Sequence, residues 1–192
     1  MDDESIRAAT IGELEPYAVK VVVEDYDPRW PAMFEANRAE IAGALGERAL
    51  LVEHTGSTSV PGLPAKPIID MLLLVADTAD EPGYVPALEA AGFQLRIRDP
   101  EWLEHRMLRR RIAEGDRYDV NLHVFSRRYA ADEIARVIGF RDWLRTHDDD
   151  RDRYATVKRE LAKRQWKYVQ NYADAKTDMI EEIHARAGLP LT

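Results

Sequence analysis

One apolar run that holds a single carboxylate constrains the fold of this chain more than any other feature. Residues 67–75 read PIIDMLLLV, so both faces of the run are apolar except at Asp70. A strand that is apolar on both faces belongs in the centre of a sheet that is covered on both sides. An unpaired carboxylate at such a place would cost several kcal/mol or lose its charge. We therefore expect a layered α/β protein in which Asp70 has a specific partner.

The remaining pattern places strands at the front of the chain and helices behind. Short β-branched or apolar runs predict strands at 18–23 and 50–53, and helical spacing predicts a helix that ends near Gly46. Further predictions are a short helix at 86–91, a hairpin with arms 105–112 and 118–125 around a turn at 113–116, and helices from 131 to 187. The fold class is α/β (α+β), a mixed sheet flanked by helices with a helical C-terminal part. Residues 1–17 predict a flexible tail before a single domain, 18–192.

Charge and composition exclude several classes of protein. The chain has 27 Lys and Arg against 35 Asp and Glu, a net charge of −8, which disfavours a protein that coats nucleic acid. It has no Cys, which excludes disulfides, thiolate zinc sites and cysteine nucleophiles. The first ten residues are acidic and polar, unlike a signal peptide, and no apolar run is long enough to span a bilayer. We expect a soluble, cytoplasmic protein with no membrane partner.

A Gly-Ser turn follows the second predicted strand. In Gly56-Ser57-Thr58-Ser59, glycine lets a ligand approach the backbone, and the amides and hydroxyls can donate to phosphate oxygens. No Gly-Lys-Ser/Thr follows, which excludes the usual P-loop. Asp70 comes soon after and could be a ligand of Mg²⁺, which takes oxygen donors together with substrate phosphates. The alternative is a carboxylate satisfied by a backbone turn or by a buried Arg or Lys.

Two further sets of residues could complete a site. Asp119, Asn121 and His123 alternate along one predicted strand and share a face, which is either a solvated edge or, beside the strand of Asp70, a place where His123 binds a metal or acts as a base. Lys158 and Lys176 each follow a Tyr by four residues, and Arg141 continues an apolar stripe. Such side chains usually reach solvent. Three of them on apolar stripes suggest a buried anion such as a triphosphate. Arginines in the first hairpin arm are expected to be solvated.

These residues together resemble the GrpB family. The resemblance rests on HTGSTSVPGL at 54–63, AKPIID at 65–70, NLHV at 121–124 and FRDWLR at 140–145, with the Tyr-Lys pairs at 154/158 and 172/176, and it covers residues 18–187. That family is placed in the nucleotidyltransferase superfamily. The resemblance implies a mixed-sheet palm, with a nucleotide and Mg²⁺ or Mn²⁺ between Gly56-Ser57 and Asp70.

The sequence departs from the superfamily at two places. Leu72 occupies the position of a second acid, and Asn121 stands where the family often has His. His54 and His123 could replace the missing acids as metal ligands, which would favour a softer ion such as Mn²⁺ or Zn²⁺.

The resulting hypothesis is transfer of a nucleotidyl group from an NTP to a small-molecule or protein acceptor. Asp70 and His123 would be catalytic, and the phosphates would be bound by Gly56, Ser57, Thr58, Lys66, Arg141, Lys158 and Lys176. The alternatives are a non-catalytic nucleotide or anion sensor and a partner-binding scaffold whose basic groups pair only with protein carboxylates. Under the first two hypotheses, Asp70 and His123 project from neighbouring strands on one face and approach within roughly 5 Å.

Overall fold

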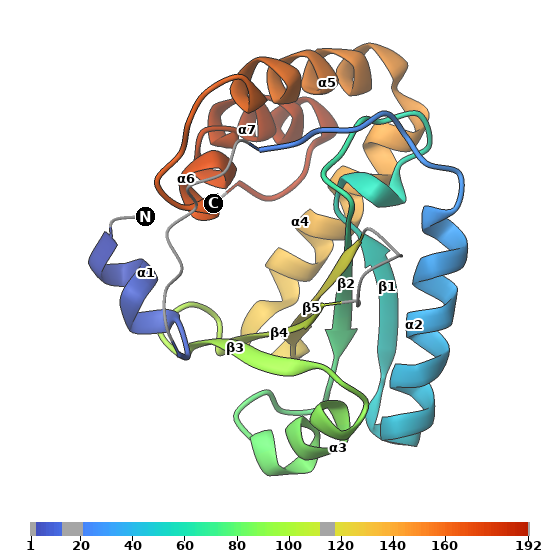
Figure 1. The fold of residues 1–192 in the computed structure, drawn as a ribbon, viewed down its shortest axis with the longest axis vertical. Coiled ribbons are helices and arrows are strands. Elements are labelled where there is room, and N and C mark those ends of the chain that lie inside the picture. Colours follow the sequence, from blue (N-terminus) through green and yellow to red (C-terminus); the bar gives the residue numbers. More distant parts are fainter. Residues whose placement is uncertain (1–2, 13–20, 112–117, 192) are drawn as a thin grey trace.

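A computed structural model describes residues 3–12, 21–111 and 118–191 of the chain. Within these ranges five strands form one mixed sheet in the order β1-β2-β5-β4-β3 (Figure 1). Their bounds are β1 Leu51–Thr55, β2 Ile68–Leu74, β3 Gln94–Asp99, β4 His105–Arg111 and β5 Asp119–Phe125. The neighbours β2 and β5 run parallel, and the other pairs are antiparallel. The apolar run therefore lies inside the sheet, as its two apolar faces predict.

Helices cover both faces of this sheet. Figure 1 shows α2 and α4 on opposite sides of it, with α5, α6 and α7 grouped together at one end of the molecule. The helices are α1 Asp3–Ala9, α2 Trp30–Leu45, α3 Val85–Ala90, α4 Arg127–Thr146, α5 Asp148–Ala162, α6 Val169–Asp174 and α7 Thr177–Ala187. One turn of 3-10 helix, η2 Ser57–Ser59, follows β1. The predicted fold class, a mixed sheet flanked by helices with a helical C-terminal part, is confirmed.

Alternation along β2 and β5 assigns one face of the sheet to the main core. Met71 and Leu73 of β2 pack in one buried cluster with Leu122 of β5 and with Trp30 and Ile41 of α2. These side chains are at most 1% exposed. Successive side chains of a strand point to opposite faces. The intervening residues of β2 and β5 therefore face the other side, where α4 lies.

Register sets which residues meet on that second face. The parallel pairing places Asp70 opposite Asn121 and Leu72 opposite His123. At the end of the face near Leu72, side chains of α4 close over it, including Ile134 and Val137. The end near Asp70 instead faces the helical C-terminal part. The candidate site lies at that end.

Several expectations from the sequence need correction. Residues 21–23 form no strand, although Glu24 makes one isolated bridge with Ala65, and residues 18–20 lie outside the described ranges. Val21 is 2% exposed because it packs against α5 and Tyr172 rather than on the sheet. The apolar character of this run therefore serves contact with the helices.

The N-terminal part and the hairpin also differ in detail from the sequence expectation. Residues 3–9 form α1, and the amide of Ile11 donates to the Arg96 carbonyl oxygen of β3 at 2.8 Å. The edge strand β3 has no counterpart in the sequence prediction. The two hairpin arms are confirmed as β4 and β5, and the predicted turn at 113–116 lies outside the described residues.

Leu122 provides a test of the core. It is fully buried between α2 and the centre of the sheet, so Leu122→Ala leaves a cavity and should lower the free energy of unfolding by about 2–5 kcal/mol. Val22→Ala is the matched control, because Val22 is 56% exposed, and it should change stability by less than about 0.5 kcal/mol. Urea denaturation measures both. Equal losses in the two variants would contradict the described core.

Candidate functional site

The Asp70 carboxylate has a specific partner on the neighbouring strand. The Nδ2 group of Asn121 donates to Asp70 Oδ1 at 3.0 Å, because the parallel register places the two residues opposite each other. Asn121 in turn accepts at its Oδ1 from Nε of Arg109 on β4 at 3.2 Å. The chain Arg109–Asn121–Asp70 crosses three strands and fixes one carboxylate oxygen. The residue that meets Asp70 is therefore Asn121, one of the departures from the family pattern.

Gly56 lies directly against this carboxylate. Its φ of 65° and ψ of −173° suit glycine, and a Cβ atom built there would lie 2.5 Å from Asp70 Oδ2. The turn is held from within, since the Ser59 hydroxyl donates to the Gly56 carbonyl oxygen at 2.5 Å. The start of η2, at Ser57, therefore follows a backbone turn that suits glycine and lies against Asp70.

The Thr58 side chain does not face the Asp70 carboxylate. It is 1% exposed, and its hydroxyl donates to the Ile68 carbonyl oxygen at 3.0 Å and lies 3.1 Å from Nε2 of His54. The hydroxyl therefore holds η2 against β2, and the predicted role of Thr58 in binding phosphate is corrected to one in shaping the turn.

Three lysines lie near enough to Asp70 for their charges to interact with its carboxylate, and each comes from a different part of the chain. Lys66 precedes β2, Lys158 lies on α5, and Lys176 precedes α7. Lys158 is 2% exposed, and its ammonium group donates to the Pro64 carbonyl oxygen and lies 5.3 Å from the centre of the Tyr154 ring. Lys66 and Lys176 both lie over Tyr172, at 5.3 Å and 4.8 Å from its ring centre. The i+4 spacing from each tyrosine predicts two of these contacts.

Burial and mutual repulsion make these ammonium charges costly. Burial is the main cause that lowers the pKa of all three lysines, and repulsion from Lys176 adds to it for Lys66 and Lys158. Attraction to the Asp70 carboxylate opposes the shift in each case. The pKa of Lys66 falls to about 8. A group of partly desolvated cations around one carboxylate gains most from binding an anion.

The Tyr172 hydroxyl is an unused donor in the same group. Tyr172 is 1% exposed, and within the described part of the chain its hydroxyl has no hydrogen-bond partner. Burial raises the pKa of this phenol, so it stays protonated. A buried, unpaired hydroxyl costs about 1–3 kcal/mol, which a ligand oxygen could recover. The sequence shows only that Tyr172 precedes Lys176 by four residues, and tertiary structure brings Lys66 to the same ring.

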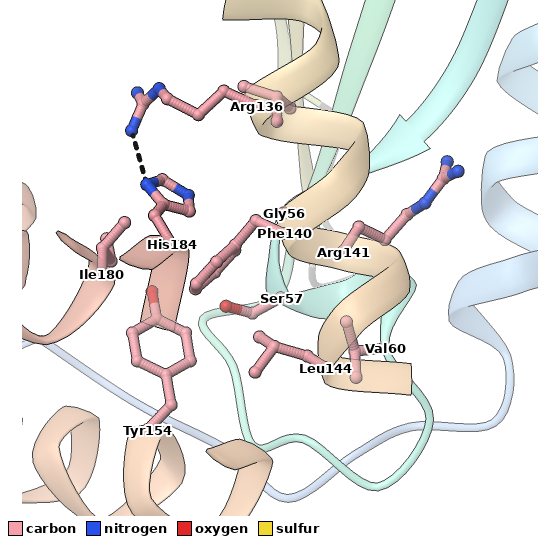
Figure 2. Close-up of a pocket in the computed structure, with 11 residues that line it drawn as sticks. Gly56, Ser57, Val60, Arg136, Phe140, Arg141, Leu144, Tyr154, Ile180 and His184 are labelled. Atoms are coloured by element: carbon pink, nitrogen blue, oxygen red, sulfur yellow. Dashed lines mark hydrogen bonds between the residues drawn. The ribbon is translucent and has the colours of Figure 1, made fainter. Parts of the chain in front are cut away.

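The Arg141 side chain connects α4 to β1 and does not face the three lysines. Its Nη1 donates to Glu53 at 2.5 Å and to the His54 carbonyl oxygen at 2.9 Å, and its Nε donates to Asp142 at 2.8 Å. In Figure 2 its guanidinium group points away from the drawn pocket. Two carboxylates neutralise this charge and fix α4 to β1. These contacts give Arg141 a structural role, and its role in binding phosphate stays a prediction.

The two predicted histidines lie on opposite faces of the sheet. His54 pairs with Met71 in the register and stacks on Phe34 of α2 at 4.8 Å, so it belongs to the main core and is separated from Asp70. His123 does share the face of Asp70, one step further along β5, and its Nδ1 lies 3.0 Å from Nε2 of His105. Burial lowers the pKa of His123, which keeps the ring neutral. The predicted approach of His123 to Asp70 within roughly 5 Å stays a prediction.

The described residues supply few ligands for a resident metal ion. No group of three or more His, Cys, Asp or Glu side chains in the described ranges could hold one. Leu72, at the place of a second acid, packs under α4. Asp70 Oδ1 accepts a hydrogen bond from Asn121, which leaves Oδ2 as the oxygen that could bind a metal ion. A single carboxylate fits Mg²⁺ only when substrate phosphates supply further oxygens.

Comparisons with known proteins agree on the family. The sequence profile of the GrpB protein family matches residues 20–186. The UPF0157 protein BH1888 of Halalkalibacterium halodurans is 52% identical over 185 residues, which cover 96% of this chain and 91% of that protein. The crystal structure of conserved protein GrpB from Enterococcus faecalis superposes with a TM-score of 0.73 at 31% identity, over 86% of this chain and 96% of that chain.

A more distant likeness is to a cytoplasmic RNA terminal U-transferase. Its TM-score is 0.42 at 12% identity, over 71% of this chain and 44% of that chain. A likeness of that size carries no argument about the chemistry of this chain. As for membranes, none of the helices in the described ranges has the length and apolar content that a bilayer crossing needs.

Substitution of Gly56 tests the close approach of the turn to Asp70. Gly56→Ala should lower the free energy of unfolding by about 1–3 kcal/mol, because of the positive φ and the contact with the carboxylate. Adding Asp70→Ala should recover only part of that loss, because it removes the contact with the carboxylate at 2.5 Å but keeps the Cβ of residue 70 at 2.9 Å. Gly43→Ala is the control: Gly43 lies in α2 with nothing within 4 Å of a Cβ, so stability should rise by up to about 1 kcal/mol. Additive losses at positions 56 and 70 in denaturation would contradict the contact.

Proposed function

The chain belongs to the GrpB family, and from this premise we propose that it is a nucleotidyltransferase that moves a nucleotidyl group from an NTP to a small-molecule or protein acceptor. The observation that carries the proposal is the group of three lysines around Asp70 beside the Gly56-Ser57 turn. A polyphosphate chain is the ligand that such a group of cations, amides and hydroxyls suits best.

The proposed binding mode assigns each group by its position. Lys66, Lys158 and Lys176 neutralise the triphosphate as point charges, and the protonated Tyr172 hydroxyl donates to one of its oxygens. Ser57 and the amides of its turn donate to another phosphate next to Asp70. Binding removes the repulsion among the lysines, which is why the empty group favours an anion.

Asp70 is the proposed link between the phosphates and a metal ion. Its free oxygen together with phosphate oxygens fits one Mg²⁺, or Mn²⁺ in its place. When bound, that ion neutralises charge that develops on the phosphates. His54 takes no part, because it faces the opposite side of the sheet.

The proposed reaction needs a nucleophile, a leaving group and a proton acceptor. An acceptor oxygen attacks the α-phosphorus, a new P–O bond forms, and the bond from the α-phosphorus to the bridging oxygen of pyrophosphate breaks. Pyrophosphate leaves with its charge balanced by the lysines. The proton of the acceptor passes to a base, and the neutral His123 on the same face is the proposed one.

A specific observation supports one alternative, a non-catalytic nucleotide or anion sensor. Leu72 stands at the position of a second acid, and three lysines lie near the single carboxylate of Asp70. The positive charge of this group suits an anion better than it suits a pair of metal ions. The scaffold alternative draws support from Arg141, which pairs with Glu53 and Asp142. Lys158, in contrast, meets a carbonyl oxygen and an aromatic ring.

Transfer itself separates an enzyme from a sensor. Wild-type protein is incubated with each α-labelled NTP, with Mg²⁺ or Mn²⁺, and with a bacterial extract as the source of acceptors. We expect a new labelled product, and we expect Asp70→Ala to lower its rate by at least about 100-fold, since the carboxylate that holds the metal is gone. Lys163→Met should retain the full rate, because Lys163 is an exposed residue just after α5 that pairs with Glu160. Saturable NTP binding without any labelled product would support the sensor instead.

Calorimetry with tripolyphosphate tests the anion site without any reaction. Lys158→Met should weaken binding at least about tenfold, or about 1.4 kcal/mol, and Lys163→Met should not. The bound anion stabilises protonated lysine, so above the Lys66 pKa of about 8 binding takes up protons and the affinity falls with rising pH. Heats measured in buffers of different ionisation enthalpy count those protons. Equal affinities for the two variants, or proton release above pH 8, would contradict the proposal.

A further inference from the structure

A cavity lies on the other side of the Gly56-Ser57 turn from the main core. Its volume is about 200 Å³, and its walls come from η2, α4, α5 and α7 (Figure 2). Val60, Leu144 and Ile180 make much of the lining apolar. None of the functions proposed for Asp70 and the three lysines near it uses this cavity.

The cavity borders residues that also lie next to Asp70 and Lys158. Figure 2 shows the Ser57 hydroxyl among the side chains that surround the space, and Gly56, the preceding residue, lies against Asp70. Tyr154 borders both sides as well, because it lines the cavity and its ring lies 5.3 Å from the Lys158 ammonium group. A ligand held in the cavity would therefore lie next to the phosphates that we propose the three lysines and the Gly56-Ser57 turn bind.

Aromatic side chains form the walls that a ligand ring would contact. The ring of Phe140 meets that of Tyr154 edge-on, with centres 5.5 Å apart and planes at 85°. It meets His184 in the same way, at 5.1 Å and 80°. Edge-to-face and offset contacts are the preferred arrangements of aromatic rings. A further planar ring would extend this arrangement.

The far end of the cavity is polar but carries little net charge. His184 is 2% exposed, and its Nδ1 lies 3.4 Å from Nη1 of Arg136. Burial is the main cause that lowers the pKa of His184, and the Arg136 charge adds to it, so the imidazole is neutral. Glu133 neutralises Arg136 through contacts of 2.7 Å and 2.9 Å, and Glu181 lies 3.9 Å from it. Such an end suits the hydrogen-bonding edge of a neutral ring better than a phosphate.

We infer that this cavity binds a planar, uncharged heteroaromatic ring by its apolar and aromatic walls and by the polar end at His184. Its volume suits one ring with its substituents, since an apolar cavity of about 150 Å³ already holds benzene. The place of that ring in the reaction rests on the proposed function: it belongs either to the base of the bound nucleotide or to the acceptor. The binding itself does not depend on the transfer reaction.

Ligand-observed NMR with free adenine, uracil and benzimidazole tests this site on the whole chain without NTP or metal. We expect saturable binding of at least one probe. Ile180→Phe fills the cavity and should weaken that binding at least tenfold. Met179→Phe, the matched control, adds an aromatic ring to a partly buried neighbour on α7 that does not line the cavity, and binding should survive. His184→Phe keeps an aromatic ring and should weaken probes that use a hydrogen-bonding edge. Unchanged thermal unfolding shows that each variant folds.

Two further arms identify the source of the ring and separate this inference from the proposed function. Displacement of the probe by a non-hydrolysable NTP analogue assigns the ring to the nucleotide, and binding of both together assigns it to the acceptor. Lys158→Met should weaken tripolyphosphate and leave the ring probe bound, so a failure of the anion site does not remove the cavity's ligand. The inference is overturned if no probe saturates the protein or if Ile180→Phe and Met179→Phe behave alike.

Discussion

The contact between the Asp70 carboxylate and the Gly56 backbone is the constraint on which the rest of the site depends. Asp70 is a charge inside a strand that is otherwise apolar, so it needs partners on the second face of the sheet. Asn121 satisfies one oxygen, and the turn at Gly56 comes so near the other that no Cβ fits. The turn therefore starts beside Asp70, and Ser57 next to it lines a cavity with residues of α4 and α5.

The helical C-terminal part brings positively charged side chains near this carboxylate. α5 carries Lys158, and the segment before α7 carries Lys176, which lies over Tyr172 together with Lys66. Burial lowers the pKa of Lys158 and of Lys176, so their positive charges are costly, and under the proposed function a bound anion offsets that cost. The arginine of α4 has the opposite role. Arg141 is neutralised by carboxylates on β1 and α4 and fastens the helix to the sheet.

A second arginine of α4 connects this helix to the Gly-Ser turn. α4 is tied to the turn by Arg145, whose guanidinium group donates to the Ser59 carbonyl oxygen at 3.0 Å and 2.9 Å. Tyr154 lies beside the Lys158 ammonium group and also lines the aromatic cavity together with Ser57. The group of lysines is cationic and the cavity is nearly neutral. A substrate with a charged end and a planar, uncharged ring matches this division.

The sequence by itself determined four of the five strands (β1, β2, β4 and β5), the helix before Gly46, the Gly-Ser turn and the Tyr-Lys pairs, because periodicity and special backbone conformations are local properties. It also identified Asp70 as the unusual charge. Tertiary structure alone decided which face each candidate reaches: His54 is in the core because its register partner is Met71, and Arg141 is paired because β1 presents Glu53 to α4. It likewise brought Arg109 and Asn121 to Asp70 and packed Val21 on helices. Register between strands and the choice of charge partners depend on residues far apart in the chain, and no local pattern encodes them.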